Sequence, residues 1–186
     1  MRPLFTVHAG EFLVGSEIER RIRHSAVWVP SKDTGIDLLV TSTRSQRPAS
    51  LQVKYSRDYS MNERGFVAIG WWTLDREVIR DSKADFWVFV LLPFEPKRSL
   101  QRTNIEYVIL PPRELAKHLT RIHGRAKRVD AYFCVTAKTK CWEVRGLKTS
   151  EKALIAVGQD DRIAKQRDFT PYLNAWHLLT KALRRG

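Results

Sequence analysis

The chain has 186 residues, 43% of them hydrophobic, which is enough for one well-buried core but too short to make two ordinary domains the expectation. Its formal net charge of +13 suits a polyanionic partner, because Lys and Arg release the counterions condensed on phosphates; a basic protein without such a partner is the alternative. No apolar run approaches the roughly 18 residues of a membrane helix, and no signal peptide is evident, so we expect a cytoplasmic protein with no membrane partner.

Hydrophobic periodicity and turn residues divide the chain into helices and strands. In chain order they predict a helix over 9–23, strands over 26–29, 36–40 and 51–55, a helix over 73–82 capped by Thr73, strands over 86–92 and 105–110, a helix opened by Pro111 and Pro112, a strand pair over 132–144 and a helix starting at Thr170. No repeat or low-complexity linker interrupts this order, so residues 1–186 are expected to form a single α/β domain. Cys134 and Cys141 could face each other across the strand pair, but free thiols are expected in a reducing cytoplasm.

Glu11 falls on the apolar face of the first predicted helix, which Val14, Ile18 and Ile22 define. A carboxylate on a face turned to the core is costly unless a partner compensates it, and a bound cation is a natural partner. The alternative is that Glu11 lies in the first turn of the helix, where the helix dipole favours a negative charge.

Asp37 interrupts the apolar strand 36–40, where a charge is normally excluded. Gln52 and Lys54 lie two residues apart on the next strand and therefore share one of its faces. The loop over 42–49 is short enough to make the two strands antiparallel neighbours, and a hairpin symmetric about it sets Asp37 across from Lys54, with Gln52 nearby. An exposed edge strand, with Gln52 and Lys54 facing water, is the alternative, but it leaves Asp37 unexplained.

These residue types suit metal-assisted hydrolysis of a phosphodiester bond. A hard cation such as Mg²⁺, or Mn²⁺ in its place, takes oxygen ligands: the Asp37 carboxylate, the Gln52 side-chain carbonyl, the Val53 main-chain carbonyl and, through water, Glu11. The cation would polarise the phosphate and lower the pKa of a bound water, and Lys54 would orient or deprotonate that water.

Three segments, residues 10–14, 35–40 and 51–56, resemble in order and spacing the motifs of the PD-(D/E)XK nuclease superfamily, which includes restriction endonucleases and archaeal Holliday junction resolvases. The resemblance covers residues 8–56 at motif level and extends loosely to 82–86, as in uncharacterised bacterial members. It implies a restriction-endonuclease-like core, a mixed β-sheet flanked by helices in the order αβββαβ, followed here by a C-terminal strand and helix extension.

The resemblance also implies that Glu11, Asp37, Gln52 and Lys54 are the catalytic residues. Two positions depart from the pattern: Ile36 replaces the motif's proline, and Gln52 stands where Asp or Glu is usual. Because the ligand that Gln52 offers is neutral, weaker metal binding is expected.

Basic residues around these motifs suit the phosphate backbone of DNA, the expected partner. They are Lys32, Arg44, Arg47, Arg57 and Arg64. For each of them alone a solvated surface charge is the favoured interpretation, so the excess as a group is what indicates DNA. Trp71 and Trp72 could wedge between bases, but core aromatics are the favoured interpretation.

Three functions fit these features. The favoured one is an active endonuclease of restriction, homing or repair type, because the Glu, Asp and Lys are all retained; a homodimer would supply two active sites for cutting both strands. The second is a DNA-binding module that kept the nuclease fold but lost turnover, with Gln52 as the sign of decay. The third is a structural or interaction protein whose polar cluster is a satisfied core network.

Overall fold

The computed structural model describes residues 4–32, 34–43, 45–55, 65–93 and 105–184. Its helices are α1 (Leu4–Arg21), α2 (Arg76–Arg80), α3 (Pro112–His123), α4 (Thr149–Val157) and α5 (Trp176–Arg184), with two short 3-10 helices, η1 (Lys165–Arg167) and η2 (Thr170–Tyr172). Its strands are β1 (Ser25–Trp28), β2 (Leu38–Ser42), β3 (Ser45–Tyr55), β4 (Phe66–Asp75), β5 (Phe86–Pro93), β6 (Glu106–Leu110), β7 (Arg128–Thr136) and β8 (Cys141–Glu143). The fold is mixed α/β, as predicted.

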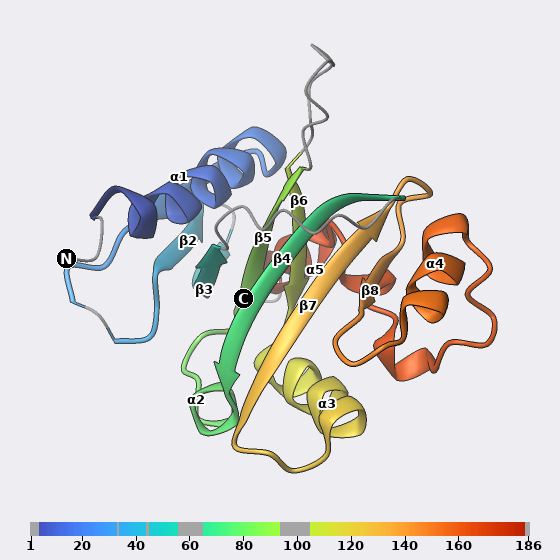
Figure 1. Cartoon of the computed structure of the whole chain (residues 1–186). Coiled ribbons are helices and arrows are strands. Elements are labelled where there is room, and N and C mark those ends of the chain that lie inside the picture. The colour runs from blue at the N-terminus through green and yellow to red at the C-terminus, as the bar shows by residue number, and fades with distance from the viewer. Residues whose placement is uncertain (1–3, 33, 44, 56–64, 94–104, 185–186) are drawn as a thin grey trace.

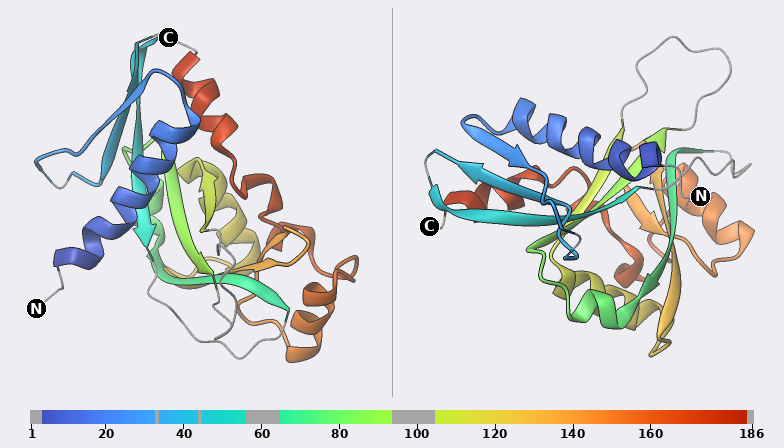
Figure 2. Two further views of the ribbon diagram at one scale, coloured as in Figure 1. Left: turned by 90° about the horizontal axis from the view of Figure 1, so that it is seen from above. Right: turned by 90° about the vertical axis from the view of Figure 1, so that its left-hand side faces the viewer.

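The strands form one open mixed sheet in the order β1-β2-β3-β5-β4-β7-β8, and β6 pairs with β5 outside this order (Figure 1). β3 and β5 run parallel, while the other described strand pairs are antiparallel. A parallel pair needs a long crossover, and β4 and α2 lie in the stretch that connects β3 to β5. α1 lies beside the first three strands at one end of the sheet, and α4 lies beside β8 at the other (Figure 1 and Figure 2).

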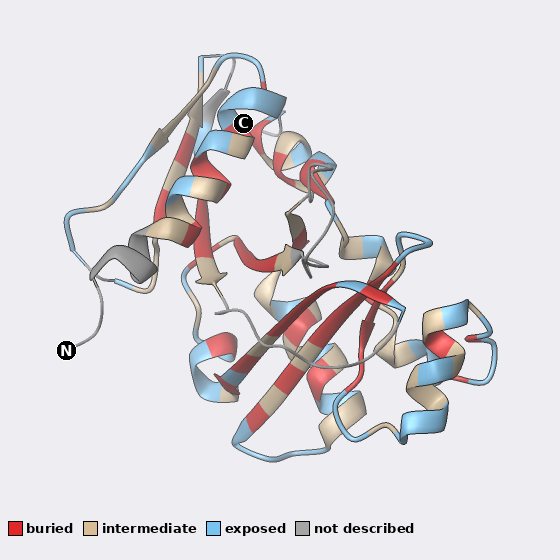
Figure 3. Ribbon diagram, turned by 45° about the horizontal axis from the view of Figure 1, so that its top comes forward, coloured by how far each residue is buried: buried red, intermediate tan, exposed pale blue. Residues whose placement is uncertain are grey.

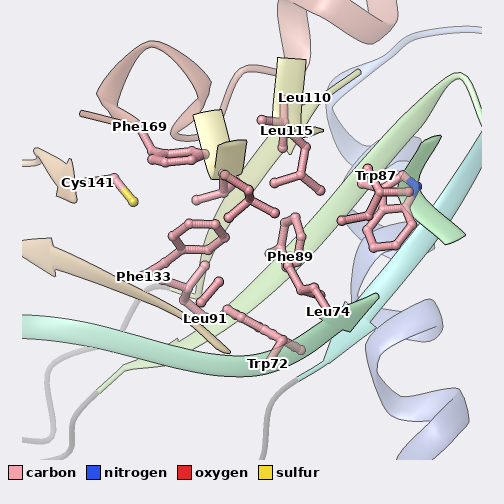
Figure 4. Close-up of a cluster of buried hydrophobic side chains, with 14 of the residues drawn as sticks. Trp72, Leu74, Trp87, Phe89, Leu91, Leu110, Leu115, Phe133, Cys141 and Phe169 are labelled. Atoms are coloured by element: carbon pink, nitrogen blue, oxygen red, sulfur yellow. The ribbon is translucent and has the colours of Figure 1, made fainter. Parts of the chain in front are cut away.

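The apolar run of β5 is covered on both faces, as predicted. Every residue from Phe86 to Leu91 is at most 7% exposed, and Figure 3 shows such buried positions along the strands and the inward helix faces. Alternate residues of the run belong to two clusters, one beneath α1 and α5 and the other against α3 and β7. Figure 4 shows the second cluster, in which Trp72 packs edge-on against Phe89 with 4.9 Å between the ring centroids. Trp72 is thus a core residue.

The hairpin of β2 and β3 is longer than predicted. The expected loop over 42–49 is mostly strand, because β3 starts at Ser45 and its ladder includes the pair Ser42 and Ser45. A bulge between Val40 and Ser42 then shifts the register of the remaining pairs.

This register changes the neighbour of Asp37. The ladder ends at the pair of Leu38 and Leu51, and the Asp37 N–H donates to the Leu51 carbonyl, so Asp37 lies beside Leu51 and not across from Lys54. The predicted opposition of Asp37 and Lys54 is therefore wrong, because the ladder continues to the pair of Ser42 and Ser45 and the turn comes earlier in the chain than the centre of the expected loop.

Thr73 is not a helix cap, because it lies inside strand β4. α2 begins only at Arg76, and the Asp75 carboxylate caps it by accepting the Glu77 N–H at 2.8 Å. Both threonine and aspartate are common N-caps, so residue type alone did not separate the two positions.

Cys134 and Cys141 are buried free thiols, as expected. In the β7–β8 ladder Cys134 pairs with Trp142, and Cys141 with Val135, so the two cysteines are offset by one position and belong to different core clusters. They therefore do not face each other, and burial raises the pKa of the Cys141 thiol well above its usual value.

A buried ion pair joins β8 to η1. Glu143 is fully buried, and its Oε2 lies 2.6 Å from Nη1 of Arg167. The other carboxylate oxygen accepts the N–H groups of Arg145 at 3.0 Å and Tyr132 at 3.3 Å. These bonds compensate the burial of the charge and fix the last part of the chain on the sheet.

Candidate metal centre

Asp37 lies directly before β2, where the ladder between β2 and β3 ends. Its N–H donates to the Leu51 carbonyl at 2.8 Å, and its carboxylate Oδ2 accepts the Val53 N–H at 2.6 Å. The side chain thus replaces a backbone acceptor at the strand end. Hydrogen bonds to a carboxylate are shorter and stronger than neutral ones, so Asp37 is firmly held beside the last residues of β3.

Gln52 and Lys54 share the face of β3 that points away from α1. The parallel register pairs them with Trp87 and Phe89 of β5, which belong to the core cluster on that face. The Lys54 Nζ lies over the Trp87 ring, 5.2 Å from its centroid. Trp87 is fixed in turn by its indole N–H, which donates to Ser82 Oγ at 2.9 Å. A cation–π contact of this kind positions the ammonium group while leaving its charge in place.

The Gln52 side chain lies two residues before Lys54 on the same strand. Gln52 is 9% exposed, and its amide atoms are not among the buried polar atoms without a hydrogen-bond partner in the described residues. Its amide oxygen is a neutral ligand of the type that a hard cation accepts.

The Val53 carbonyl points to the same side as Asp37. The Val53 N–H donates to the Asp37 carboxylate, and the N–H and C=O of one residue in a strand are directed to the same neighbour. A carboxylate, an amide side chain and a backbone carbonyl are therefore brought to one strand end, and they are the oxygen ligands that Mg²⁺ prefers.

Glu11 comes to this strand end from the other side of the sheet. α1 starts at Leu4, so Glu11 lies about two turns inside the helix and the first turn holds no acidic residue. The alternative of a dipole-stabilised first-turn acid is therefore wrong. Gly10 packs so tightly that a Cβ on it would lie 2.6 Å from Cβ of Tyr55, and α1 covers the face that carries Val53 and Tyr55. The structure thus puts Gln52 and Lys54 on one face of β3 and Asp37 at the strand end beside them, whereas α1, which carries Glu11, covers the opposite face.

The basic residues predicted to contact DNA are only partly described. The structure includes Lys32 and Arg47, whereas Arg44, Arg57 and Arg64 lie outside the described residues. Lys32 is exposed in the segment between β1 and β2. Arg47 lies five residues before Gln52, about 17 Å away along the strand. There its Nη2 is 3.6 Å from Oδ1 of Asp85, and it lines a cavity of about 160 Å³ between β3, the start of β5 and α5.

In the part of the chain that the structure describes, no three or more His, Cys, Asp or Glu side chains are grouped so that they could hold a metal ion. The predicted centre has only two acidic residues, Glu11 and Asp37, so it would not form such a group. Among the described helices none is both long and apolar enough to cross a membrane.

Comparison of the chain with protein-family models, curated proteins and solved structures found no match.

Sequence reasoning missed two residues that shape the centre. Trp87 positions Lys54, but its place beside β3 depends on a parallel pairing of segments more than 30 residues apart. Gly10 lets α1 approach the end of β3 closely, and its position directly before Glu11 is a signal that the sequence did offer.

Proposed function

We propose that the chain is a metal-dependent endonuclease of the PD-(D/E)XK type that hydrolyses DNA phosphodiester bonds. The observation that carries the proposal is that Asp37, held by its hydrogen bond from the Val53 N–H, meets the end of β3 that carries Gln52 and Lys54. Together they offer a carboxylate oxygen and an amide oxygen, which a hard cation prefers, beside an ammonium group.

In this proposal Mg²⁺, or Mn²⁺ in its place, would polarise the scissile phosphate and lower the pKa of a bound water. Asp37, Gln52 and the Val53 carbonyl would hold the cation, and Glu11 would reach it through water. Lys54, held over Trp87, would orient the attacking water and offset the charge that develops on the phosphate.

The order of the elements supports a restriction-endonuclease-like core. α1, β1, β2 and β3 are followed by α2 and β5, which is the αβββαβ order with β4 added before α2. β5 lies next to β3 and parallel to it. The elements from β6 to α5 then form the C-terminal extension of one domain.

DNA is the proposed partner because the net charge of +13 favours a polyphosphate. A homodimer acting in the cytoplasm would supply two centres for a double-strand cut. The same charge would attract RNA. The proposed preference for DNA therefore rests on the motif resemblance, and parallel assays with DNA and RNA substrates test it.

The direct test is incubation of supercoiled plasmid with the protein, with and without Mg²⁺ or Mn²⁺. We expect metal-dependent nicking that is lost in Asp37→Ala and in Lys54→Ala. Asp161→Ala and Lys117→Ala, which remove one exposed acid and one exposed base on other elements, serve as matched controls and should cut like the wild type. Cutting by both site variants at the wild-type rate would show that the centre is wrongly assigned.

A second candidate function is a DNA-binding module that has lost turnover. The neutral Gln52 in place of an acid favours it, as does the Asp37 Oδ2 being engaged by the Val53 N–H. This function predicts salt-sensitive binding of DNA with no cleavage at any Mg²⁺ or Mn²⁺ concentration.

A further inference from the structure

Trp28 is a large aromatic residue at the open edge of the sheet. It is the last residue of β1, which ends the strand order, and it is 59% exposed. Its indole N–H donates to Thr41 Oγ1 on the neighbouring strand at 3.0 Å. This bond ties the Nε1 edge of the ring to β2, while more than half of the residue stays exposed. A single exposed hydrophobic residue needs no explanation by itself; its location is what matters here.

Trp28 lies on the same face of the sheet as the proposed metal centre. It pairs with Leu39 of β2, and Leu39 pairs with Ser50 of β3. Directly paired residues share a face, and so do Ser50 and Gln52, two positions apart. Two strand spacings of about 4.8 Å separate Trp28 from β3, and Gln52 lies about 7 Å further along that strand. The ring is therefore within one or two nucleotides' reach of a phosphate held at the centre.

This face of β1 and β2 is open. Leu39 and Thr41 are only partly buried, whereas Val40, which points to the α1 side, is 0% exposed. The part of the sheet that carries Trp28 thus offers a surface that a ligand can cover, beside the more buried positions Ser50 and Gln52 of β3.

We propose that Trp28 is a stacking platform for an unpaired base, and that the substrate is single-stranded or locally opened DNA; this rests on the proposed nuclease function. The π-face of a base is hidden in a continuous duplex and becomes accessible once the strand is unpaired, when an aromatic ring can stack on it. The chain's net charge of +13 and the Lys54 ammonium on this face match a polyanionic strand better than they match a second, equally basic copy of the chain.

The test measures binding apart from cleavage. Affinities of a fluorescent single-stranded oligonucleotide and of the matching duplex are measured by anisotropy in EDTA, so that no metal-dependent cutting occurs. Trp28→Ala should weaken single-strand binding about 5- to 100-fold, the usual range for loss of one stacked base, and should change duplex binding far less. Trp28→Phe should keep most of the affinity, and Thr41→Val, which frees the ring, should lose a smaller part of it. Val157→Ala, which truncates a 58% exposed side chain on α4, is the matched control.

The outcomes separate the two proposals. The platform is overturned if Trp28→Ala binds the single strand as tightly as the wild type does. It is also overturned if Trp28→Ala loses a dimer in sedimentation while its DNA binding is unchanged, because the ring would then contact a second copy. If the wild type never cleaves but the Trp28 effect on binding is present, the platform stands and the nuclease function fails. A thermal melt of each variant shows that the fold is intact.

Discussion

Replacing Asp37 separates its structural role from its proposed metal role. In Asp37→Ala the Val53 N–H loses the acceptor that lies 2.6 Å away, at the point where the β2–β3 ladder ends. Loss of a partly buried bond to a carboxylate costs about 1–3 kcal/mol. For a chain of this length each kcal/mol lowers the melting temperature by about 2–4 °C, so we expect a decrease of about 2–12 °C.

Asp37→Asn keeps an oxygen that can accept the same N–H but removes the charge. Its melting temperature without metal should therefore lie closer to that of the wild type than that of the alanine variant does. Ligand that binds only the folded state adds about 1.4 kcal/mol at ten times its dissociation constant. Saturating Mg²⁺ should thus raise the melting temperature of the wild type by about 3–6 °C and that of neither variant.

Differential scanning fluorimetry with and without Mg²⁺ measures both effects, with Asp161→Ala as the control for an exposed carboxylate. Equal destabilisation of the alanine and asparagine variants would refute the role of the Val53 hydrogen bond. Equal Mg²⁺ stabilisation of the wild type and of both variants would refute Asp37 as a ligand, whatever their intrinsic stability.

Three further predictions concern the fold that holds the centre. Gly70→Ala should destabilise the protein by about 1–3 kcal/mol in a denaturant titration, because its Cβ would lie 2.1 Å from the Trp72 ring, whereas Gly15→Ala, with its nearest contact at 3.5 Å, should not. Glu143→Ala should cost about 3–5 kcal/mol by leaving the guanidinium of the buried ion pair without its carboxylate; a loss below 1 kcal/mol would show that the pair is not buried as described. Burial raises the pKa of Tyr107 to about 12, so between pH 10 and 12 the folded state keeps the phenol proton that the unfolded state loses. The wild type should therefore lose stability relative to Tyr107→Phe across that window, and parallel stability curves would contradict the shift.

The strands that were predicted best are those with an unbroken apolar run. The strand over 86–92 needed no knowledge of its partners, because Phe86 to Leu91 are buried on both faces of the sheet. β4 was missed because Gly70 lowers strand propensity and Thr73 was interpreted as a helix cap, whereas the strand is held by its long ladder with β7. Pairing over such a distance is a tertiary effect that local propensity does not report.

The site was predicted in part for the same reason. That Gln52 and Lys54 share a face follows from the two-residue period of any strand. Which group lies opposite Asp37 depends on the position of the turn and on a bulge, and a bulge displaces the register without leaving a hydrophobic signature. Trp87 positions Lys54 only because the crossover places β5 beside β3, so this contact could be known only from the fold.

One geometric fact connects the centre with the stacking platform. α1 and α5 bury one face of the first three strands, and they leave the opposite face open next to β1 and β2. Trp28, Gln52 and Lys54 all lie on that opposite face by the observed registers, and Asp37 holds the strand end beside them through the Val53 N–H. An aromatic ring, an amide and an ammonium group on one face, next to a carboxylate, favour a ligand site over a neutral surface.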